Sequence, residues 1–236
     1  MRLAVNQPYL FPYLGYFQLI QRCDAFLPYA LVDYVNKSWI NRNRFVQNDQ
    51  LRYFSIPVKR ESLGRPIQFM EFIEPVDWFK RTQSKLQVAY TRAPFKRETL
   101  IFLDRLRHRL EPIESAVDFL IISLRETCSY LDIDTPFLSP SELEAIETLV
   151  RQEQDITRRR HARVISLCNH FGADTYMNLP GGIDIYDAHY LRMNGIQFQA
   201  MAFGIPSLNS QPVPFAYASI IHLLMMYGKD QVKAWI

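Results

Sequence analysis

Short apolar runs lie near both ends of this 236-residue chain, and a long stretch with helical periodicity separates them. Leu3–Val5, Ala25–Tyr29 and Leu51–Val58 have the length and composition of strands. Tyr176–Asn178 and Ile196–Met201 are similar runs in the last third of the chain. Apolar runs this short are typical of strands buried in a parallel sheet, whose connections are helices. The pattern predicts an α/β fold with a central, mostly parallel sheet from N- and C-terminal segments and a helical insertion.

The middle of the chain carries the helical pattern. Apolar residues recur at helical spacing between Lys96 and Leu110, and again between Ile113 and Leu131. We therefore divide the chain into three segments. Residues 1–77 form the N-terminal part of the α/β domain, residues 78–150 a helical insertion or subdomain, and residues 151–236 the C-terminal part of the α/β domain.

Composition excludes several classes of protein. Apolar residues make up 48% and charged residues 22%, as in ordinary globular proteins, which excludes a disordered or collagen-like chain. The net charge of +3 is too small to favour nucleic acid as a partner. Three widely spaced cysteines fit reduced thiols. No signal peptide and no apolar run of ~18 residues is present, so we predict a cytoplasmic protein without a membrane span.

Amide and phenol side chains follow the first predicted strand. The carboxyl ends of strands are where open α/β sheets bind ligands, and amides there can donate to and accept from a substrate. A merely structural loop, packed under the domain and stiffened by proline, is the alternative. The candidate substrate-binding residues of this segment are Asn6, Gln7, Tyr9, Tyr13, Gly15 and Tyr16.

A cluster of polar, basic and aromatic residues precedes the strand predicted over Leu51–Val58. Trp39 and Asn41 are candidate substrate contacts, and Asp33 is a candidate general base. Arg42 or its neighbour Arg44 has the geometry to hold a phosphate or carboxylate through two hydrogen bonds, and we select Arg42 as the catalytic candidate. The alternative is a solvated hairpin whose asparagines satisfy turns.

Two further candidates stand near the ends of predicted strands. Lys59 follows a strand and is suited to neutralising an anion, although such a lysine is often merely solvated. Asn178 ends another strand and is a candidate substrate contact. Asp187 and His189 lack a third ligand, so no metal site is predicted, and the sequence indicates no particular cofactor. His222 lies in an apolar helix, where a packed histidine is the simpler interpretation.

These residues resemble the WbqC-like family of bacterial proteins. The resemblance implies a role in surface polysaccharide biosynthesis, such as that of O-antigen and lipopolysaccharide, with a nucleotide-sugar transferase as the implied activity. The sequence departs from the family pattern at His222, where an aspartate is usual. The resemblance is carried by Asn6–Tyr9, Gly15–Tyr16, Trp39–Asn43, Pro57–Lys59, Gly172–Tyr176, Gly181–Asp187, Gly195–Ile196 and Ser219–Ile221.

The first functional hypothesis is a transferase that binds an anionic, nucleotide- or phosphate-linked donor. Its partner would be a small phosphorylated or sugar substrate. One alternative is a non-catalytic sugar- or nucleotide-binding partner protein, favoured by the shortage of recognisable nucleophile motifs. Another is a divergent nucleotidylyltransferase-like enzyme, because Tyr13–Tyr16 follows the first strand and opens a helix. Tyrosine cannot supply the cation that a histidine would provide there.

Overall fold

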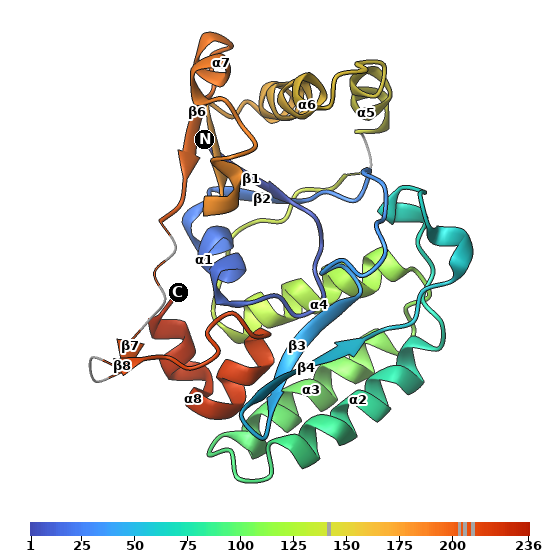
Figure 1. Ribbon diagram of the computed structural model, residues 1–236, viewed down its shortest axis with the longest axis vertical. Coiled ribbons are helices and arrows are strands. Elements are labelled where there is room, and N and C mark those ends of the chain that lie inside the picture. The colour runs from blue at the N-terminus through green and yellow to red at the C-terminus, as the bar shows by residue number, and fades with distance from the viewer. Residues whose placement is uncertain (141–142, 203, 205–206, 209–210) are drawn as a thin grey trace. The chain divides into compact units, whose positions relative to one another are not determined.

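A computed structural model gives the fold of the chain and describes residues 1–140, 143–202, 204, 207–208 and 211–236 (Figure 1). The contacts group these residues into two compact units that interleave along the sequence. Unit 1 comprises Met1–Gln7, Gln18–Leu31 and Thr135–Gly204, and unit 2 comprises Pro8–Phe17, Val32–Asp134 and Ile205–Ile236.

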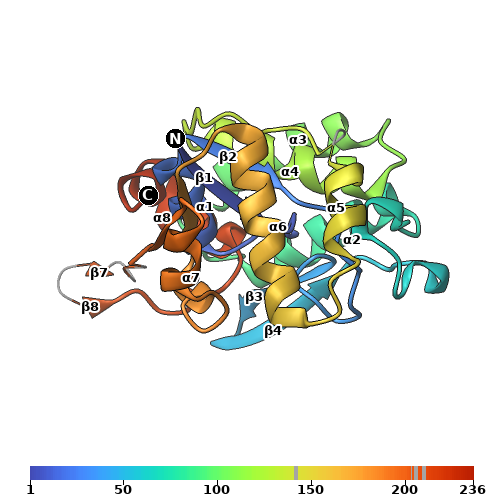
Figure 2. The same ribbon diagram turned by 90° about the horizontal axis from the view of Figure 1, so that it is seen from above.

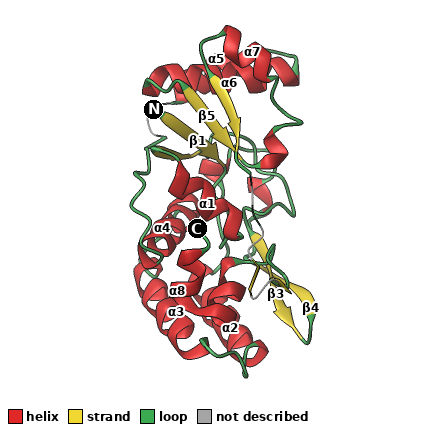
Figure 3. Cartoon of the chain, turned by 90° about the vertical axis from the view of Figure 1, so that its left-hand side faces the viewer, coloured by secondary structure: helices red, strands yellow, loops and turns green. Residues whose placement is uncertain are grey.

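Unit 1 contains a four-stranded parallel sheet. Its strands are β1 (Arg2–Asn6), β2 (Ala25–Pro28), β5 (Thr175–Asn178) and β6 (Gln197–Ala200), in the order β2-β1-β5-β6. Leu3 lies opposite both Ala25 and Tyr176, so the first strand joins segments from the two ends of the sequence. Figure 3 shows β1 and β5 side by side. The α/β fold predicted from the sequence is confirmed, including the parallel sheet from N- and C-terminal segments.

Helices connect and cover the strands of unit 1. They are α5 (Glu144–Val150), α6 (Ile156–Phe171), α7 (Ala188–Met193) and the 3-10 turn η3 (Pro180–Gly182), and α1 (Leu14–Arg22) enters this unit from unit 2. α6 packs against β5, and α7 packs against β6. Figure 2 labels both helices. The carboxylate of Asp155 accepts the N–H of Arg158 at 2.7 Å and begins α6. Gly172, with φ +66°, ends the helix.

Unit 2 combines a hairpin with a group of helices. Its elements are β3 (Arg42–Gln47), β4 (Gln50–Ser55), the 3-10 turns η1 (Arg60–Ser62) and η2 (Ile67–Phe69), α2 (Pro75–Ala89), α3 (Lys96–Leu110), α4 (Ala116–Tyr130), β7 (Ser207–Leu208), β8 (Gln211–Pro212) and α8 (Ile220–Ala234). α3 packs against α2, α4 and α8, and β3 packs against α2 and α8. One strand of the hairpin thus packs against α2 from the middle of the sequence and against α8 from its end.

The hairpin corrects one detail of the sequence prediction. The strand predicted over Leu51–Val58 is β4, which ends at Ser55 and pairs with β3 in an antiparallel ladder outside the parallel sheet. No strand was predicted for β3, because its polar residues mask the alternation. The two turn residues, Asn48 and Asp49, have positive φ values of 50° and 56°, as a two-residue hairpin turn requires.

The last helix, α8, is interrupted by a glycine. Gly228 interrupts α8 with φ 76° and ψ 172°, and helical structure resumes after it. A Cβ atom at this position would lie 2.6 Å from Cδ1 of Phe95, so both the backbone conformation and the close approach of the ring require glycine. The chain therefore turns at Gly228 and continues to Ala234.

Candidate functional site

Amide side chains of unit 1 lie at the carboxyl ends of its two central strands. β1 ends at Asn6 and the neighbouring β5 ends at Asn178. The chain passes from β1 to β2 on one side of this strand pair and from β5 to β6 on the other. Such a reversal leaves a crevice where open α/β sheets bind ligands. The structure therefore brings the predicted residues Asn6, Gln7 and Asn178 to one edge of the sheet.

Asn178 also shapes the loop that follows β5. Its Oδ1 accepts the N–H of Leu179 at 2.8 Å, and its Nδ2 donates to the hydroxyl of Tyr176 at 3.0 Å. A Cβ atom on Gly182 would lie 2.8 Å from this Nδ2, closer than side chains pack. The loop therefore passes over Asn178 only because residue 182 is glycine.

Unit 2 holds a pocket of about 250 Å³ that is lined by aromatic side chains and one arginine. It is formed by the segment Pro8–Phe17, by β3 with the residues before it, and by the residues before α8. We call it the aromatic–arginine pocket. Its lining residues are Tyr9, Pro12, Tyr13, Trp39, Asn43, Arg44 and Tyr217.

Asn43 holds the first of these segments against β3. Its side chain is 4% exposed, and its Nδ2 donates to the carbonyls of Leu10 at 2.9 Å and Phe11 at 2.8 Å. Its Oδ1 accepts the N–H of Arg44 at 2.8 Å. Phe11 has φ 43°, a left-handed conformation that a side chain disfavours. The two hydrogen bonds that this buried amide donates therefore stabilise an unfavourable turn of the backbone.

Ser219 fixes the segment that precedes α8. Its Oγ donates to the carbonyl of Phe11 at 2.8 Å and accepts the N–H of Ile221, which caps the helix. Its own N–H donates to the carbonyl of Arg44 at 2.9 Å. The N–H of Ile220 donates to the carbonyl of Pro12 at 2.9 Å. These bonds place Tyr217, Tyr13 and Arg44 around one space, although they are far apart in the sequence.

Guanidinium groups and aromatic rings alternate along the outer side of the hairpin. Arg42 and Arg44 are two residues apart on β3 and so share a face of the ladder. The Cζ of Arg44 lies 5.0 Å from the centre of the Trp39 ring. The Cζ of Arg42 lies 5.8 Å from the same ring and 4.8 Å from that of Tyr53. Stacking on aromatic faces holds both planar cations in place.

Neither guanidinium is neutralised by a carboxylate in the part of the chain that the structure describes. The Nη2 of Arg44 donates to the carbonyl of Tyr217 at 3.1 Å. The Nε atoms of Arg42 and Arg44 are buried, and no described residue accepts a hydrogen bond from them. A buried donor without a partner costs about 1–3 kcal/mol. Both arginines therefore carry a buried N–H donor that no described residue uses.

Phenols supply the other polar groups of the pocket. The rings of Tyr13 and Tyr217 lie 5.9 Å apart. Burial raises the pKa of Tyr13 to about 12, with smaller contributions from Tyr217 and Tyr9. Burial likewise raises the pKa of Tyr9. Both hydroxyls stay protonated near neutral pH, so they are hydrogen-bond donors to an anion and cannot act as bases.

Three other predicted residues support the pocket from inside. Tyr16 is completely buried and its ring lies 5.5 Å from that of Tyr9. Gly15 is buried in the first turn of α1. Asn41 is 8% exposed and its Nδ2 donates to the carbonyl of Ile56 at 3.0 Å. None of these three residues lines the pocket.

Asp33 and Lys59 lie in unit 2 but do not line the pocket. Asp33 is exposed, and its backbone forms a bridge with Pro66. The ammonium of Lys59 lies 2.6 Å from the carboxylate of Glu71, and both side chains are more than half exposed. The roles of Asp33 as a base and of Lys59 as a phosphate ligand stay predictions.

Sequence reasoning did not select Asn43 and Tyr217, and it preferred Arg42 to Arg44. The spacing of the two arginines was a usable signal, because a strand places residues i and i+2 on one face. The asparagine between them then points to the opposite face, as its burial shows. No local pattern marked Tyr217, since Pro8–Phe17 is distant from it in the sequence.

His222, at which the sequence departs from the expected pattern, is buried in a polar contact. Its Nδ1 lies 3.0 Å from the hydroxyl of Tyr90, which also accepts the N–H of Val46 at 2.9 Å. Which of the two atoms donates in this hydrogen bond depends on the tautomer of the imidazole. Burial lowers the pKa of His222 to about 4. His222 is thus a packed histidine, and it does not line the aromatic–arginine pocket.

The profile of the WbqC-like protein family matches residues 7–234. The chain belongs to this family. The match begins at Gln7 and extends to the last residue of α8, so it covers the whole lining of the aromatic–arginine pocket. The family resemblance carried by the sequence motifs is confirmed.

A relative of this WbqC-like protein is the uncharacterized protein Rv1507c of Mycobacterium tuberculosis (strain ATCC 25618 / H37Rv). The two are 24% identical over 191 residues, which cover 79% of this chain and 75% of the relative. No solved structure matches the chain. Among the described residues, no helix is both long and apolar enough to cross a bilayer, and no three His, Cys, Asp or Glu side chains gather where a metal ion would be held.

Proposed function

We propose that this WbqC-like protein binds an anionic donor in the aromatic–arginine pocket and is a transferase of bacterial surface polysaccharide biosynthesis. The donor is a nucleotide- or phosphate-linked sugar. The observation that carries the proposal is the pair Arg42 and Arg44, which no described carboxylate neutralises. Arginine remains charged at any physiological pH, so these groups attract phosphate.

The size of the pocket suggests that it holds only one part of the donor and that the remainder binds beside it. Its volume of about 250 Å³ is at the lower limit of ligand pockets, which hold roughly 300–1,000 Å³. It therefore accepts a phosphate group or one ring of a donor. Trp39 and Tyr53, which are 36% and 54% exposed, offer adjacent aromatic faces for the remainder. A base or sugar that stacks there would keep its phosphate close to the guanidinium groups.

The chemistry of the pocket suits the departure of a phosphate leaving group. Negative charge develops on that group during transfer, and fixed donors that face it lower the barrier. Arg44 in the lining and Arg42, beside the pocket on the same face of β3, supply cations, and the protonated hydroxyls of Tyr9 and Tyr13 supply neutral donors.

A second function is a donor-binding partner protein without catalysis. The described residues that line the pocket include no carboxylate, histidine or cysteine, and so no ready base or nucleophile. Product formation separates the two functions. If the pure protein binds a nucleotide-sugar but never transfers the sugar to any member of a panel of sugar and lipid-phosphate acceptors, it is a binding partner.

The donor site is tested by titration calorimetry with three probes: inorganic pyrophosphate, glucose 1-phosphate and UDP-glucose. The double variant Arg42→Gln, Arg44→Gln should weaken binding of the best probe at least about tenfold, since each charged hydrogen bond contributes about 1.5–3 kcal/mol. Arg52→Gln is the matched control, because Arg52 lies on β4 and its guanidinium donates to Gln50. Absence of binding by all three probes, or equal binding by the double variant, would refute the proposal.

A further inference from the structure

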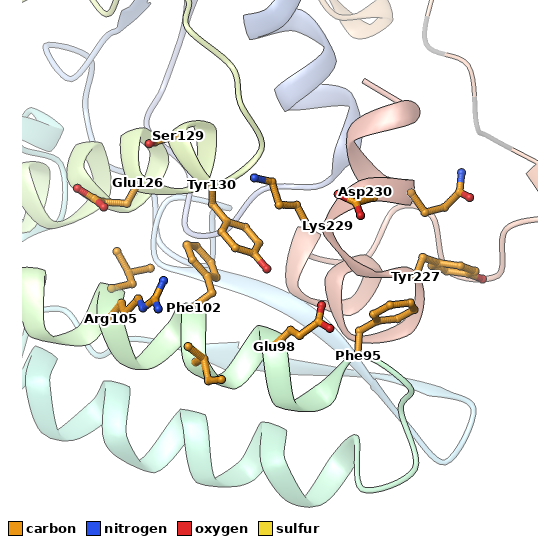
Figure 4. A pocket seen from close by; sticks show the side chains of 13 residues that line it. Phe95, Glu98, Phe102, Arg105, Glu126, Ser129, Tyr130, Tyr227, Lys229 and Asp230 are labelled. Atoms are coloured by element: carbon orange, nitrogen blue, oxygen red, sulfur yellow. The ribbon is translucent and has the colours of Figure 1, made fainter.

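A second and larger cavity lies in unit 2 between α3, α4 and α8 (Figure 4). Its volume is about 870 Å³, and it shares no lining residue with the aromatic–arginine pocket. Aromatic rings from all three helices or their flanks form part of its wall: Phe95, Phe102, Tyr130 and Tyr227. Neither the motifs discussed above nor the proposed function accounts for this cavity.

Three oxygen-bearing side chains in the cavity come from three different helices. Glu98 belongs to α3, Tyr130 to α4 and Asp230 to α8. No hydrogen bond or ion pair joins any of the three to another described residue. Figure 4 shows the side chains of Glu98 and Tyr130 pointing into the space between the helices. The protein itself therefore leaves three hydrogen-bond acceptors in one cavity.

The neighbouring charges of the cavity, by contrast, are paired. Lys229 places its ammonium 3.0 Å from the carboxylate of Asp132. The carboxylate of Glu126 lies 3.4 Å from the guanidinium of Arg109. Lys229 and Glu126 are therefore neutralised by residues outside the lining. Glu98 and Asp230 are the carboxylates of the lining that form no ion pair with a described residue. Arg105 also lines the cavity, and its guanidinium forms no ion pair with any described residue.

Charged groups of the cavity lining act on the hydroxyl of Tyr130. Burial raises the pKa of Tyr130, and the charges of Glu98 and Asp230 raise it further, whereas Arg105 lowers it. Phe102 stacks on the Tyr130 ring with centroids 4.3 Å apart. The ammonium of Lys229 lies 5.4 Å from the centre of that ring, a cation–π contact. The phenol oxygen thus remains neutral beside two negative charges.

We propose that this cavity binds a small organic compound through a primary ammonium group. An ammonium has three N–H donors and no acceptor, which matches the three oxygen groups of Glu98, Asp230 and Tyr130. The aromatic wall covers the carbon skeleton next to the nitrogen. A volume of about 870 Å³ is within the range of pockets that hold a complete small ligand. An amino sugar and a linear diamine share this chemistry.

The proposal is tested with the full chain and two ammonium probes, glucosamine and 1,5-diaminopentane. Ligand-observed NMR at pH 7 measures their dissociation constants. At least one probe should bind, and N-acetylglucosamine, which lacks the charge, should bind at least about tenfold more weakly than glucosamine if the amino sugar is the preferred source. If the diamine is preferred, its diacetylated derivative should lose binding in the same way.

Variants distinguish this site from non-specific attraction. Glu98→Gln and Asp230→Asn should each weaken ammonium binding about tenfold, while Glu114→Gln, an exposed carboxylate outside the cavity, should not. Arg105→Gln removes a positive charge from the lining, so it should leave binding unchanged or strengthen it. If neither probe binds at 10 mM (roughly the weakest specific binding of interest), or if Glu98→Gln and Glu114→Gln behave alike, the proposal is wrong.

Discussion

Asn43 is the residue whose replacement should most clearly disturb the aromatic–arginine pocket. Its buried amide makes three hydrogen bonds, to the carbonyls of Leu10 and Phe11 and from the N–H of Arg44. Each such bond contributes about 1 kcal/mol to the free energy of unfolding. Asn43→Ala removes all three and leaves the backbone groups without these partners. We expect the free energy of unfolding to fall by about 3 kcal/mol.

The loss should be measured by urea denaturation followed by circular dichroism. Asn36→Ala is a matched control, because Asn36 is exposed and lies in the same unit, and it should change the free energy of unfolding by less than about 0.5 kcal/mol. Asn43→Asp keeps the volume and the acceptor for Arg44 but places an oxygen against two carbonyls.

Asn43→Asp should therefore destabilise the protein at least as much as Asn43→Ala does. Binding of the donor probes should fall in both variants, since the turn at Phe11 positions Pro12 and Tyr13. If Asn43→Ala costs less than about 1 kcal/mol, or if the aspartate variant is as stable as the natural protein, Asn43 does not hold the segment in place.

Two further predictions concern a glycine and a histidine. Gly182→Ala should cost about 1–3 kcal/mol in thermal denaturation, because its Cβ would lie 2.8 Å from Asn178, whereas Gly181→Ala, with open space around it, should cost less. The pKa of His222 is about 4 when folded and 6.5 when unfolded, so the unfolded state binds more protons between these values. His222 should therefore contribute a fall of about 3 kcal/mol in the free energy of unfolding from pH 7 to pH 4. His222→Gln, beside Tyr90, should remove this contribution from the pH profile. A pH profile unchanged by that variant would contradict the prediction.

The parallel sheet was predictable because its strands are local patterns. Leu3–Val5 and Tyr176–Asn178 are short apolar runs, and each lies within a strand of the sheet. Burial on both faces makes such strands uniformly apolar and so easy to recognise. The hairpin strand β3 was missed because Arg42 and Arg44 on its outer side interrupt the apolar pattern. The turn residues that follow β3 carried the better signal.

Contacts between distant segments could not be predicted from the sequence. In unit 1 the carboxylate of Glu147, which is 4% exposed, accepts two hydrogen bonds from Arg163 at 2.7 Å and one from the hydroxyl of Tyr29 at 2.6 Å. Tyr29 is 118 positions away from Glu147 along the chain. The interleaving of the two units has the same origin, since contacts rather than sequence order define them. The predicted segment bounds at residues 77 and 150 stay a prediction.

The candidate site was predictable in its residue types and only partly in their roles. Tyr9, Tyr13 and Trp39 were selected as substrate contacts, and they line the aromatic–arginine pocket. Tyr16 and Asn41 were selected for the same reason, but the structure buries them. A polar or aromatic side chain in a motif has two uses, to contact a ligand or to hold the backbone, and only burial and hydrogen-bond partners separate these uses.

The segment Asn41–Arg44 shows how both uses fit into four consecutive residues. Asn41 and Asn43 are buried and donate to carbonyls of other segments. Arg42 and Arg44 lie on the opposite side of β3, where their guanidinium groups stack on aromatic rings. Because successive side chains of a strand alternate between faces, an insertion of one residue would exchange anchors and cations. The alternation of asparagine and arginine therefore couples two features of the pocket. When the asparagines of the strand form their buried hydrogen bonds, both arginines must lie on its outer face.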